Sequence, residues 1–157
     1  SSANRYLPDL IEHIKKLGLP AVGHIRGLPE ADLISMESPT LRLSGDLLDL
    51  ERAVAECSIG VTQGGMHTSA RLLLAGVPLL ICPEQLEQTL LAYRMQERGL
   101  CRYISSFSEA GKVKERFNEV SQSWELKKSV MDFALKHAGY DESMTVRAIA
   151  RECLSAA

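Results

Sequence analysis

The chain lacks several features that would narrow its function at once. It has no apolar stretch long enough to cross a bilayer, which takes about 20 residues in an α-helix. Its 18 basic and 20 acidic residues leave a net charge of −2. This balance gives no electrostatic reason to expect nucleic acid or another polyanion as a partner. The sequence therefore predicts a soluble, cytoplasmic protein with no membrane span and no nucleic-acid partner.

Cysteine is also scarce, and its spacing excludes the familiar metal motifs. The chain has no C-x-x-C pair, and no histidine stands at metal-ligand spacing from a cysteine. Most of the cysteines fall at the edges of apolar runs, where a free thiol behaves as a small hydrophobe. No nucleophile elbow or catalytic triad order is found among the serines and aspartates. We therefore expect neither a bound metal nor a catalytic residue in this segment. The cysteines are Cys57, Cys82, Cys101 and Cys153.

The composition is that of one globular domain: 157 residues, 45% of them apolar and 24% charged. Short apolar runs alternate with longer segments that have apolar residues at helical spacing. This alternation predicts an α/β fold, in which a Rossmann-like parallel sheet is flanked by helices and followed by a helical C-terminus. No repeat or linker interrupts the pattern, so a single domain over residues 1–157 is expected. The predicted strands are 21–25, 41–45, 58–63, 79–83 and 101–104.

The helical segments are placed by apolar spacing and by their end signals. A single helical turn is expected between Pro29 and Pro39, and Asp46 is expected to cap the helix that precedes the third strand. Two or three helices are expected after residue 104. The remaining predicted helices cover residues 5–18, 67–76 and 87–99.

The most informative segment is the turn that follows the third predicted strand. There an apolar strand runs into two glycines, and a helix begins at once. Glycines let the backbone approach a ligand closely, and the free N–H groups at a helix N-terminus favour an anion such as a diphosphate. The alternative is that the glycines only make a tight strand-to-helix turn, as in many α/β proteins. The residues are Gln63, Gly64, Gly65, Met66, His67 and Thr68.

The wider segment over residues 58–99 resembles the donor-binding signature of nucleotide-sugar glycosyltransferases of the GT-B fold, the UDP-glycosyltransferase-like group. That signature has an apolar strand, His-x-Gly, a Ser or Thr, a Gly-Val-Pro strand, an Asp-Gln pair and a helix ending in Gly. The resemblance implies that the chain is the C-terminal, nucleotide-sugar-binding half of such a fold. The matching positions are Gly65, Thr68, Gly76-Val77-Pro78, Pro83, Gln88, Ala92 and Gly99.

By this resemblance, the six residues Gln63 to Thr68 surround the diphosphate of the donor. Glu87 and Gln88 fall where the family's Asp-Gln pair reaches the hydroxyls of the donor sugar. A carboxylate and an amide together accept from and donate to a diol, so Glu87 keeps that chemistry on a longer side chain. Without the resemblance, Glu87 and Gln88 would be interpreted as an exposed first helical turn.

Three positions depart from the family pattern. Gln63 stands where the family has a histidine, and Arg71 stands where it has the glutamate that binds the ribose. Arginine has no acceptor for ribose hydroxyls, so that contact is lost or replaced. The Trp-x-Pro-Gln segment that frames the base in many members is absent, and the corresponding residues are 45–48.

The resemblance implies a hexosyl-transferring glycosyltransferase that uses a nucleoside diphosphate sugar, with UDP- or dTDP-sugars favoured, and needs no cofactor. The acceptor and the acid–base residue are expected in an N-terminal domain or a separate acceptor subunit, so the isolated segment is expected to be inactive. An apolar face normally covered by that partner is expected to let the fragment form a homodimer. Two alternatives stay open: a sugar-nucleotide epimerase of the same fold, and a non-catalytic or degenerate nucleotide-sugar-binding module.

Overall fold

The computed structural model describes residues 6–104 and 112–155, and it has the expected alternation of strands and helices. The first half of the chain runs α1 (Leu7–Leu17), β1 (Ala21–His24), α2 (Glu30–Met36), β2 (Leu41–Ser44), α3 (Leu50–Glu56) and β3 (Gly60–Thr62). It continues with α4 (Met66–Leu74), β4 (Leu79–Ile81), α5 (Leu86–Glu97) and β5 (Cys101–Tyr103). Three helices follow: α6 (Lys112–Gln122), α7 (Trp124–Lys136) and α8 (Glu142–Ser155). The α/β class and the helical C-terminus are confirmed.

The strands are all parallel, but they form two sheets rather than the single sheet that was expected. β1 pairs with β2, and β3, β4 and β5 form a separate sheet in that order. The strands on either side of this break bury few side chains. Val22 of β1 is 59% exposed, and Gly23 in β1 and Gly60 in β3 have no side chains to pack. Within the described residues, no backbone ladder joins β1 to β3.

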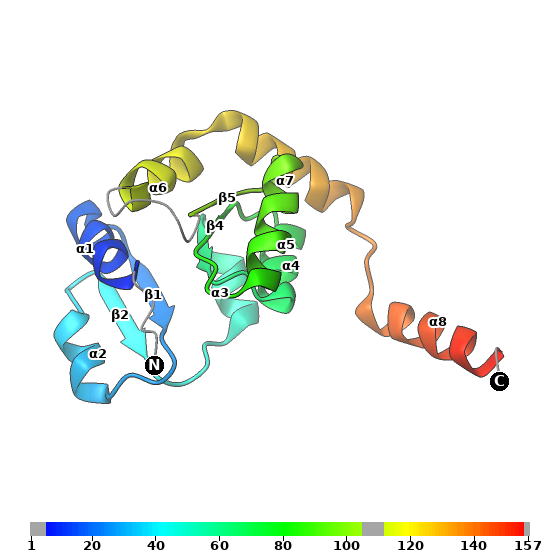
Figure 1. Cartoon of the computed structure of the whole chain (residues 1–157), viewed down its shortest axis with the longest axis horizontal. Helices are drawn as coiled ribbons and strands as arrows, with labels where there is room; N and C mark the ends of the chain where they lie inside the picture. The colour runs from blue at the N-terminus through cyan, green and yellow to red at the C-terminus, as the bar shows by residue number, and fades with distance from the viewer. Residues whose placement is uncertain (1–5, 105–111, 156–157) are drawn as a thin grey trace.

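The core is centred on β4. Leu79, Leu80 and Ile81 are fully buried, as expected for the middle strand of a parallel sheet, which is covered on both faces. Burial of each such side chain contributes roughly 2 kcal/mol of hydrophobic free energy. Helix α6 contacts α1 as well as β4 and β5 (Figure 1).

Two local predictions were wrong. The segment between Pro29 and Pro39 holds the seven-residue helix α2 rather than a single turn, because Leu33 buries its side chain, at 3% exposure, where α2 packs against β2. Asp46 does not cap α3. Its N–H donates to Ser44 Oγ at 2.9 Å, and the cap is Asp49, whose side chain accepts from the Arg52 N–H at 3.2 Å.

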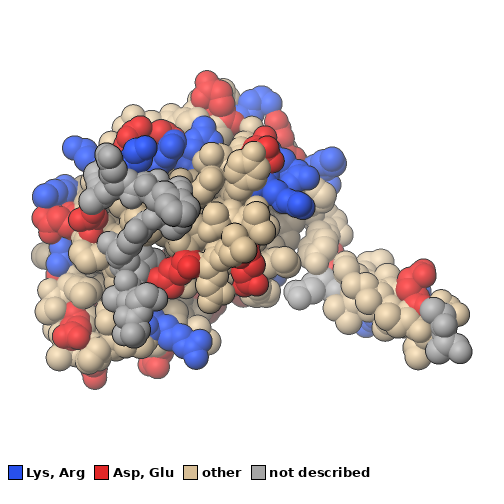
Figure 2. All heavy atoms as spheres, viewed as in Figure 1, with Lys and Arg blue, Asp and Glu red and all other residues tan. Residues whose placement is uncertain are grey.

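The last helix is set apart from the rest of the chain. In Figure 1, α8 projects away from the body formed by the other elements. Every side chain described on it is exposed. Within the described residues, no helix is both long and apolar enough to cross a membrane. Acidic and basic side chains are interspersed over the face shown in Figure 2, with no large area of either sign.

Candidate functional site

The turn predicted to bind a diphosphate connects the carboxyl end of β3 to the first residue of α4. Gly64 is buried and has φ +91°, a conformation that favours glycine. A Cβ atom on Gly64 would lie 2.9 Å from Ile81 Cγ2 on β4 and 3.5 Å from Gln88 Cβ on α5. The turn is therefore packed directly against the neighbouring strand and helix, and its backbone path is fixed by them.

Gly65, in contrast to the buried Gly64, is exposed. It is the N-cap residue of α4, with φ −60° and ψ 130°, and no side chain caps this helix end. A Cβ atom on Gly65 would meet nothing within 4 Å. The first hydrogen bond back into the helix is from Ser69 N–H to the Gly65 carbonyl at 3.0 Å. The N–H groups of Met66, His67 and Thr68 therefore have no hydrogen-bond partner within the helix.

Helices α1, α2 and α4 have no side-chain cap at their N-termini, whereas α3 and α7 are capped. Asp49 caps α3, and Ser123 caps α7 by accepting from the Leu126 N–H at 3.1 Å. An uncapped helix N-terminus combines unpaired N–H donors with the positive end of the helix dipole. The chemistry of the turn thus suits an anion with several oxygens, such as a diphosphate.

Thr62, the last residue of β3, contributes to the turn although the sequence analysis did not select it. Its Oγ1 accepts a hydrogen bond from the Gly64 N–H at 3.0 Å. This bond turns the Gly64 amide back towards the strand. A threonine two residues before a glycine at a strand end is a recognised turn signal, and it was present in the sequence.

The side chains of the turn differ in exposure. Gln63, Met66 and His67 are exposed, whereas Thr68 is half-buried. Met66 is the extreme case, with 75% of its surface exposed. The predicted diphosphate residues therefore lie at one helix end, where the side chains of Gln63, Met66 and His67 are accessible.

Glu87 and Gln88 lie in the first turn of α5, next to this site. Glu87 is exposed, and Gln88 is half-buried beside Gly64. Gln88 Oε1 accepts from the Glu84 N–H at 2.9 Å and from the Gln85 N–H at 3.2 Å. The carbonyl oxygen of Gln88 therefore caps α5, and its amide nitrogen is the group that remains to donate to a ligand.

Arg71 lies one helical turn beyond Thr68 and is half-buried. Its Nη2 forms an ion pair with Oε1 of Glu51 in the first turn of α3. Glu51 was not selected from the sequence, because nothing in a local pattern links two residues on different helices. The position expected to contact a ribose is thus occupied by Arg71, which is ion-paired with Glu51.

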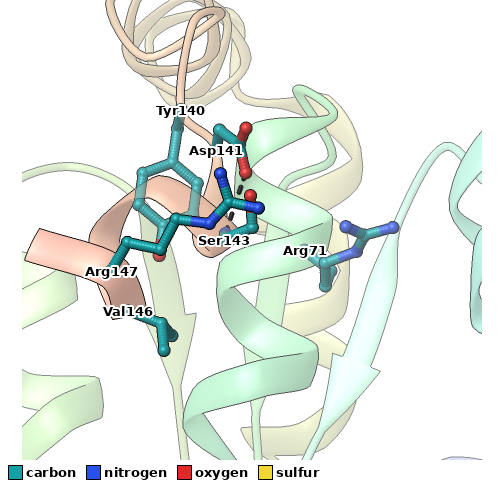
Figure 3. A pocket seen from close by; sticks show the side chains of 6 residues that line it. All are labelled: Arg71, Tyr140, Asp141, Ser143, Val146 and Arg147. Atoms are coloured by element: carbon teal, nitrogen blue, oxygen red, sulfur yellow. Dashed lines mark hydrogen bonds between the residues drawn. The ribbon is translucent and has the colours of Figure 1, made fainter. Parts of the chain in front are cut away.

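Arg71 also borders a hollow of about 710 Å³ between α4 and the start of α8, together with Tyr140, Asp141, Ser143, Val146 and Arg147. In Figure 3 the Arg71 guanidinium points away from the other five side chains. Asp141 accepts from the Ser143 N–H at 2.8 Å, and hydrogen bonds from Ser143 lower the pKa of the Asp141 carboxyl. Asp141 thus accepts from the first amides of α8, while Arg71 is paired with Glu51 on α3, so these polar groups do not converge on a common point.

A second hollow, of about 530 Å³, has Arg102 and Glu119 on its wall. Glu119 accepts from Arg102 Nε at 3.2 Å and from Arg116 Nη1 at 2.8 Å, so its charges are already paired. In the part of the chain that the structure describes, no group of three or more His, Cys, Asp or Glu side chains is placed to hold a metal ion. The turn at Gln63–Thr68 is the stronger candidate site.

The chain is similar to glycosyltransferases in sequence and in fold. No protein-family model matches it. It is 31% identical over 87 residues to the zeaxanthin glucosyltransferase of Pseudescherichia vulneris, a match that covers 55% of this chain and 21% of that protein. It is 34% identical over 104 residues to the NDP-glycosyltransferase YjiC of Bacillus subtilis (strain 168), covering 64% of this chain and 26% of the relative.

The fold is also that of solved glycosyltransferases. The structure of glycosyltransferase VinC in complex with dTDP superposes with a TM-score of 0.75 at 18% identity, over 94% of this chain and 37% of that one. The chain therefore spans about a quarter of the length of the two sequence relatives and somewhat more of the solved structure. The resemblance predicted from the sequence is confirmed: this chain is similar in sequence and in fold to the C-terminal domain of GT-B glycosyltransferases.

Proposed function

We propose that the chain binds a nucleoside diphosphate sugar at the Gln63–Thr68 turn and forms the donor-binding half of a glycosyltransferase. The observation that carries this proposal is the uncapped N-terminus of α4, whose unpaired amides adjoin the open space over Gly65. Three N–H donors and the helix dipole suit the two phosphates of such a donor. The similarity to glycosyltransferases supports the same assignment.

The proposed reaction is displacement at the anomeric carbon of the donor sugar. The acceptor oxygen forms a bond to that carbon, the bond from the carbon to the diphosphate oxygen breaks, and the electron pair stays on the diphosphate. The N–H groups of Met66, His67 and Thr68 stabilise the charge that develops there, because they are already oriented before the reaction. These donors act without a metal ion, so a chelator should leave donor binding unchanged.

The donor in this proposal is a hexose linked to UDP or dTDP. Glu87 accepts from the sugar hydroxyls, and the Gln88 amide nitrogen donates to them beside Gly64. The VinC structure, which contains dTDP, supports a pyrimidine nucleotide.

We further infer that the acceptor and the acid–base residue come from an N-terminal domain or from a separate acceptor subunit. The small share of each relative that this chain covers supports this inference. On this account the chain binds the donor but does not transfer the sugar by itself.

Calorimetric titration with UDP, dTDP and GDP tests the proposal. Gly65→Trp should abolish binding, because its backbone angles suit any residue and its side chain would fill the open space. Thr68→Ala should weaken binding about fivefold through loss of one hydroxyl donor. Thr40→Ala is the matched control, since Thr40 is also half-buried but precedes β2, at the opposite edge of its sheet.

Saturable binding of one nucleoside diphosphate that is lost in Gly65→Trp and kept in Thr40→Ala would support the donor site. Equal binding by wild type and Gly65→Trp would refute it. A non-catalytic binding module is the second candidate, because capping of α5 occupies the Gln88 carbonyl. Hydrolysis or transfer of the sugar by the chain together with its acceptor-binding partner would exclude this second candidate.

A further inference from the structure

Thr62 takes part in two hydrogen bonds at the start of the β3–α4 turn. Its carbonyl accepts from the Cys82 N–H at 2.8 Å, which attaches the end of β3 to the residue just after β4. Its side-chain Oγ1 accepts from the Gly64 N–H at 3.0 Å. The same residue therefore pairs with the neighbouring strand and holds the first glycine of the turn.

The Gly64 amide depends on this side chain for its partner. Gly64 is buried, and a Cβ atom there would meet Ile81 and Gln88. In the part of the chain that the structure describes, Thr62 Oγ1 is the one acceptor of its N–H. A buried N–H without an acceptor costs free energy, so loss of the Thr62 hydroxyl would favour a different path for the turn.

The two glycines make such a change of path easy. Glycine adopts positive and negative φ with similar ease, and here Gly64 has φ +91° whereas Gly65 has φ −60°. The peptide group between Gln63 and Gly64 is planar, so a hydrogen bond to its N–H orients the whole group. The Thr62 hydroxyl therefore restrains a turn whose glycines have little conformational preference of their own.

Helix α4 does not need this restraint, but the space beside it does. Leu72 and Leu73 are buried, so the core sets the direction of the helix and of the unpaired N–H groups in its first turn. The side of Gly65 that is open within 4 Å lies next to Gly64 in the chain. It stays open while Gly64 is held against β4 and α5, and the Thr62 bond helps to hold Gly64 there.

We propose that Thr62 is a positioning residue for diphosphate binding at the α4 N-terminus, an inference that rests on the proposed function. Its hydroxyl holds the Gly64 amide, and the turn thereby stays clear of the space that the phosphates occupy. Thr62 itself does not touch the ligand. Its loss therefore weakens the binding of every ligand with a diphosphate group to the same extent, whatever nucleoside the ligand carries.

Calorimetric titration with UDP and with inorganic pyrophosphate tests this role. Thr62→Val keeps the branched shape of the side chain but has no acceptor, and it should weaken the binding of both ligands about fivefold. Thr62→Ser keeps the hydroxyl and should bind both as wild type does. Thr40→Val is the matched control, because Thr40 is also half-buried and has its hydroxyl 3.4 Å from Ser38 Oγ; it should leave both affinities unchanged.

Backbone amide NMR gives a second readout, which a role in stability alone would not produce. When pyrophosphate is added to wild type, the Gly64 amide should shift little, because Thr62 already holds it, while the amides of Met66, His67 and Thr68 shift. In Thr62→Val the Gly64 amide should shift as well, since it has lost its acceptor.

The possible failures separate this role from the donor site. Wild-type affinity in a folded Thr62→Val chain, or a wild-type Gly64 amide that shifts as much as those of Met66 to Thr68, would overturn the role of Thr62 and leave the diphosphate site intact. A loss of binding that Thr62→Ser does not restore would overturn it too. Failure of wild type to bind either UDP or pyrophosphate would overturn the proposed function, and this inference with it.

Discussion

Gly64 and Gly65 are neighbours in the β3–α4 turn but have opposite structural constraints. Gly64 has positive φ and is in contact with β4 and α5, whereas Gly65 has ordinary angles and an open side. The first glycine is needed to make the turn. The second leaves the space over the helix end empty, which is where the proposed ligand binds.

Alanine at these two positions should separate the two roles. Gly64→Ala should lower the free energy of unfolding by about 2 kcal/mol, because of the positive φ and the close approach of Ile81 Cγ2. Gly65→Ala should change it by less than about 1 kcal/mol. Urea unfolding of both variants measures the difference, and equal losses would show that the turn is not fixed by β4 and α5.

Cys82, just after β4, should make the free energy of unfolding fall as pH rises. Burial raises the pKa of its thiol to about 12, from an ordinary value near 9. Between these pH values the unfolded chain loses the proton and the folded chain keeps it, so stability falls as pH rises. At pH 10 the loss from this thiol is about 1 kcal/mol.

Urea unfolding at pH 8 and pH 10, in the presence of a reductant, checks this prediction. The decrease in unfolding free energy should be smaller in Cys82→Ala than in wild type by about 1 kcal/mol. Burial likewise raises the pKa of Cys101 to about 12, so part of the decrease should remain. The same decrease in both proteins would mean that the Cys82 thiol is accessible to water in the folded state.

Among the elements, α4 links the core to the candidate site. Its first residues face open space, while Leu72 and Leu73 are buried and the helix packs against α7. The amides proposed to bind the diphosphate are therefore held by a helix that is itself anchored in the core. Such anchoring orients the donors before a ligand arrives, which is the condition for effective charge stabilisation.

Helix α8, unlike α4, is not anchored in the core. Met144, Val146, Ile149 and Leu154 are each more than half exposed, and the helix stands apart in Figure 1. A 14-residue helix is only marginally stable in water without a partner surface. The exposed apolar residues of α8 are thus the part of the described chain best suited to the self-association expected of the fragment.

Removal of residues 141–157 tests whether α8 mediates self-association. The unfolding free energy should change by less than about 0.5 kcal/mol, because α8 buries little of itself. Any concentration-dependent dimer seen by size-exclusion chromatography should be lost. A fall of several kcal/mol on truncation would show instead that α8 packs on the body of the chain, and a strictly monomeric full chain would refute the dimer.

For the whole molecule, the order of elements could be predicted from the sequence, and the partnerships between them could not. Short apolar runs located the strands found in the described residues, and Gly64-Gly65 marked the turn at the candidate site. Asp46 and Asp49 both fit an N-cap pattern, and Asp49 is the cap because the helix begins at Leu50. The Glu51–Arg71 pair and the capping role of Gln88 depend on packing between elements, which no local pattern encodes.

The break between the two sheets also depends on the whole molecule. Each strand was recognisable by itself, but neither strand alone could predict that β1 and β3 do not pair within the described residues. The candidate site does not depend on that pairing, since the turn, β4 and α5 belong to the second sheet and its helices.

The central claim is that a nucleoside diphosphate binds at the N-terminus of α4. The most direct measurement is a titration of the isotope-labelled chain with UDP, followed through its backbone amide resonances by NMR. The account predicts saturable shifts concentrated at Gly65, Met66, His67 and Thr68, with smaller shifts at Glu87 and Gln88. Shifts confined to another surface, such as the hollow beside Arg102 and Glu119, or no shifts at high UDP concentration, would contradict it.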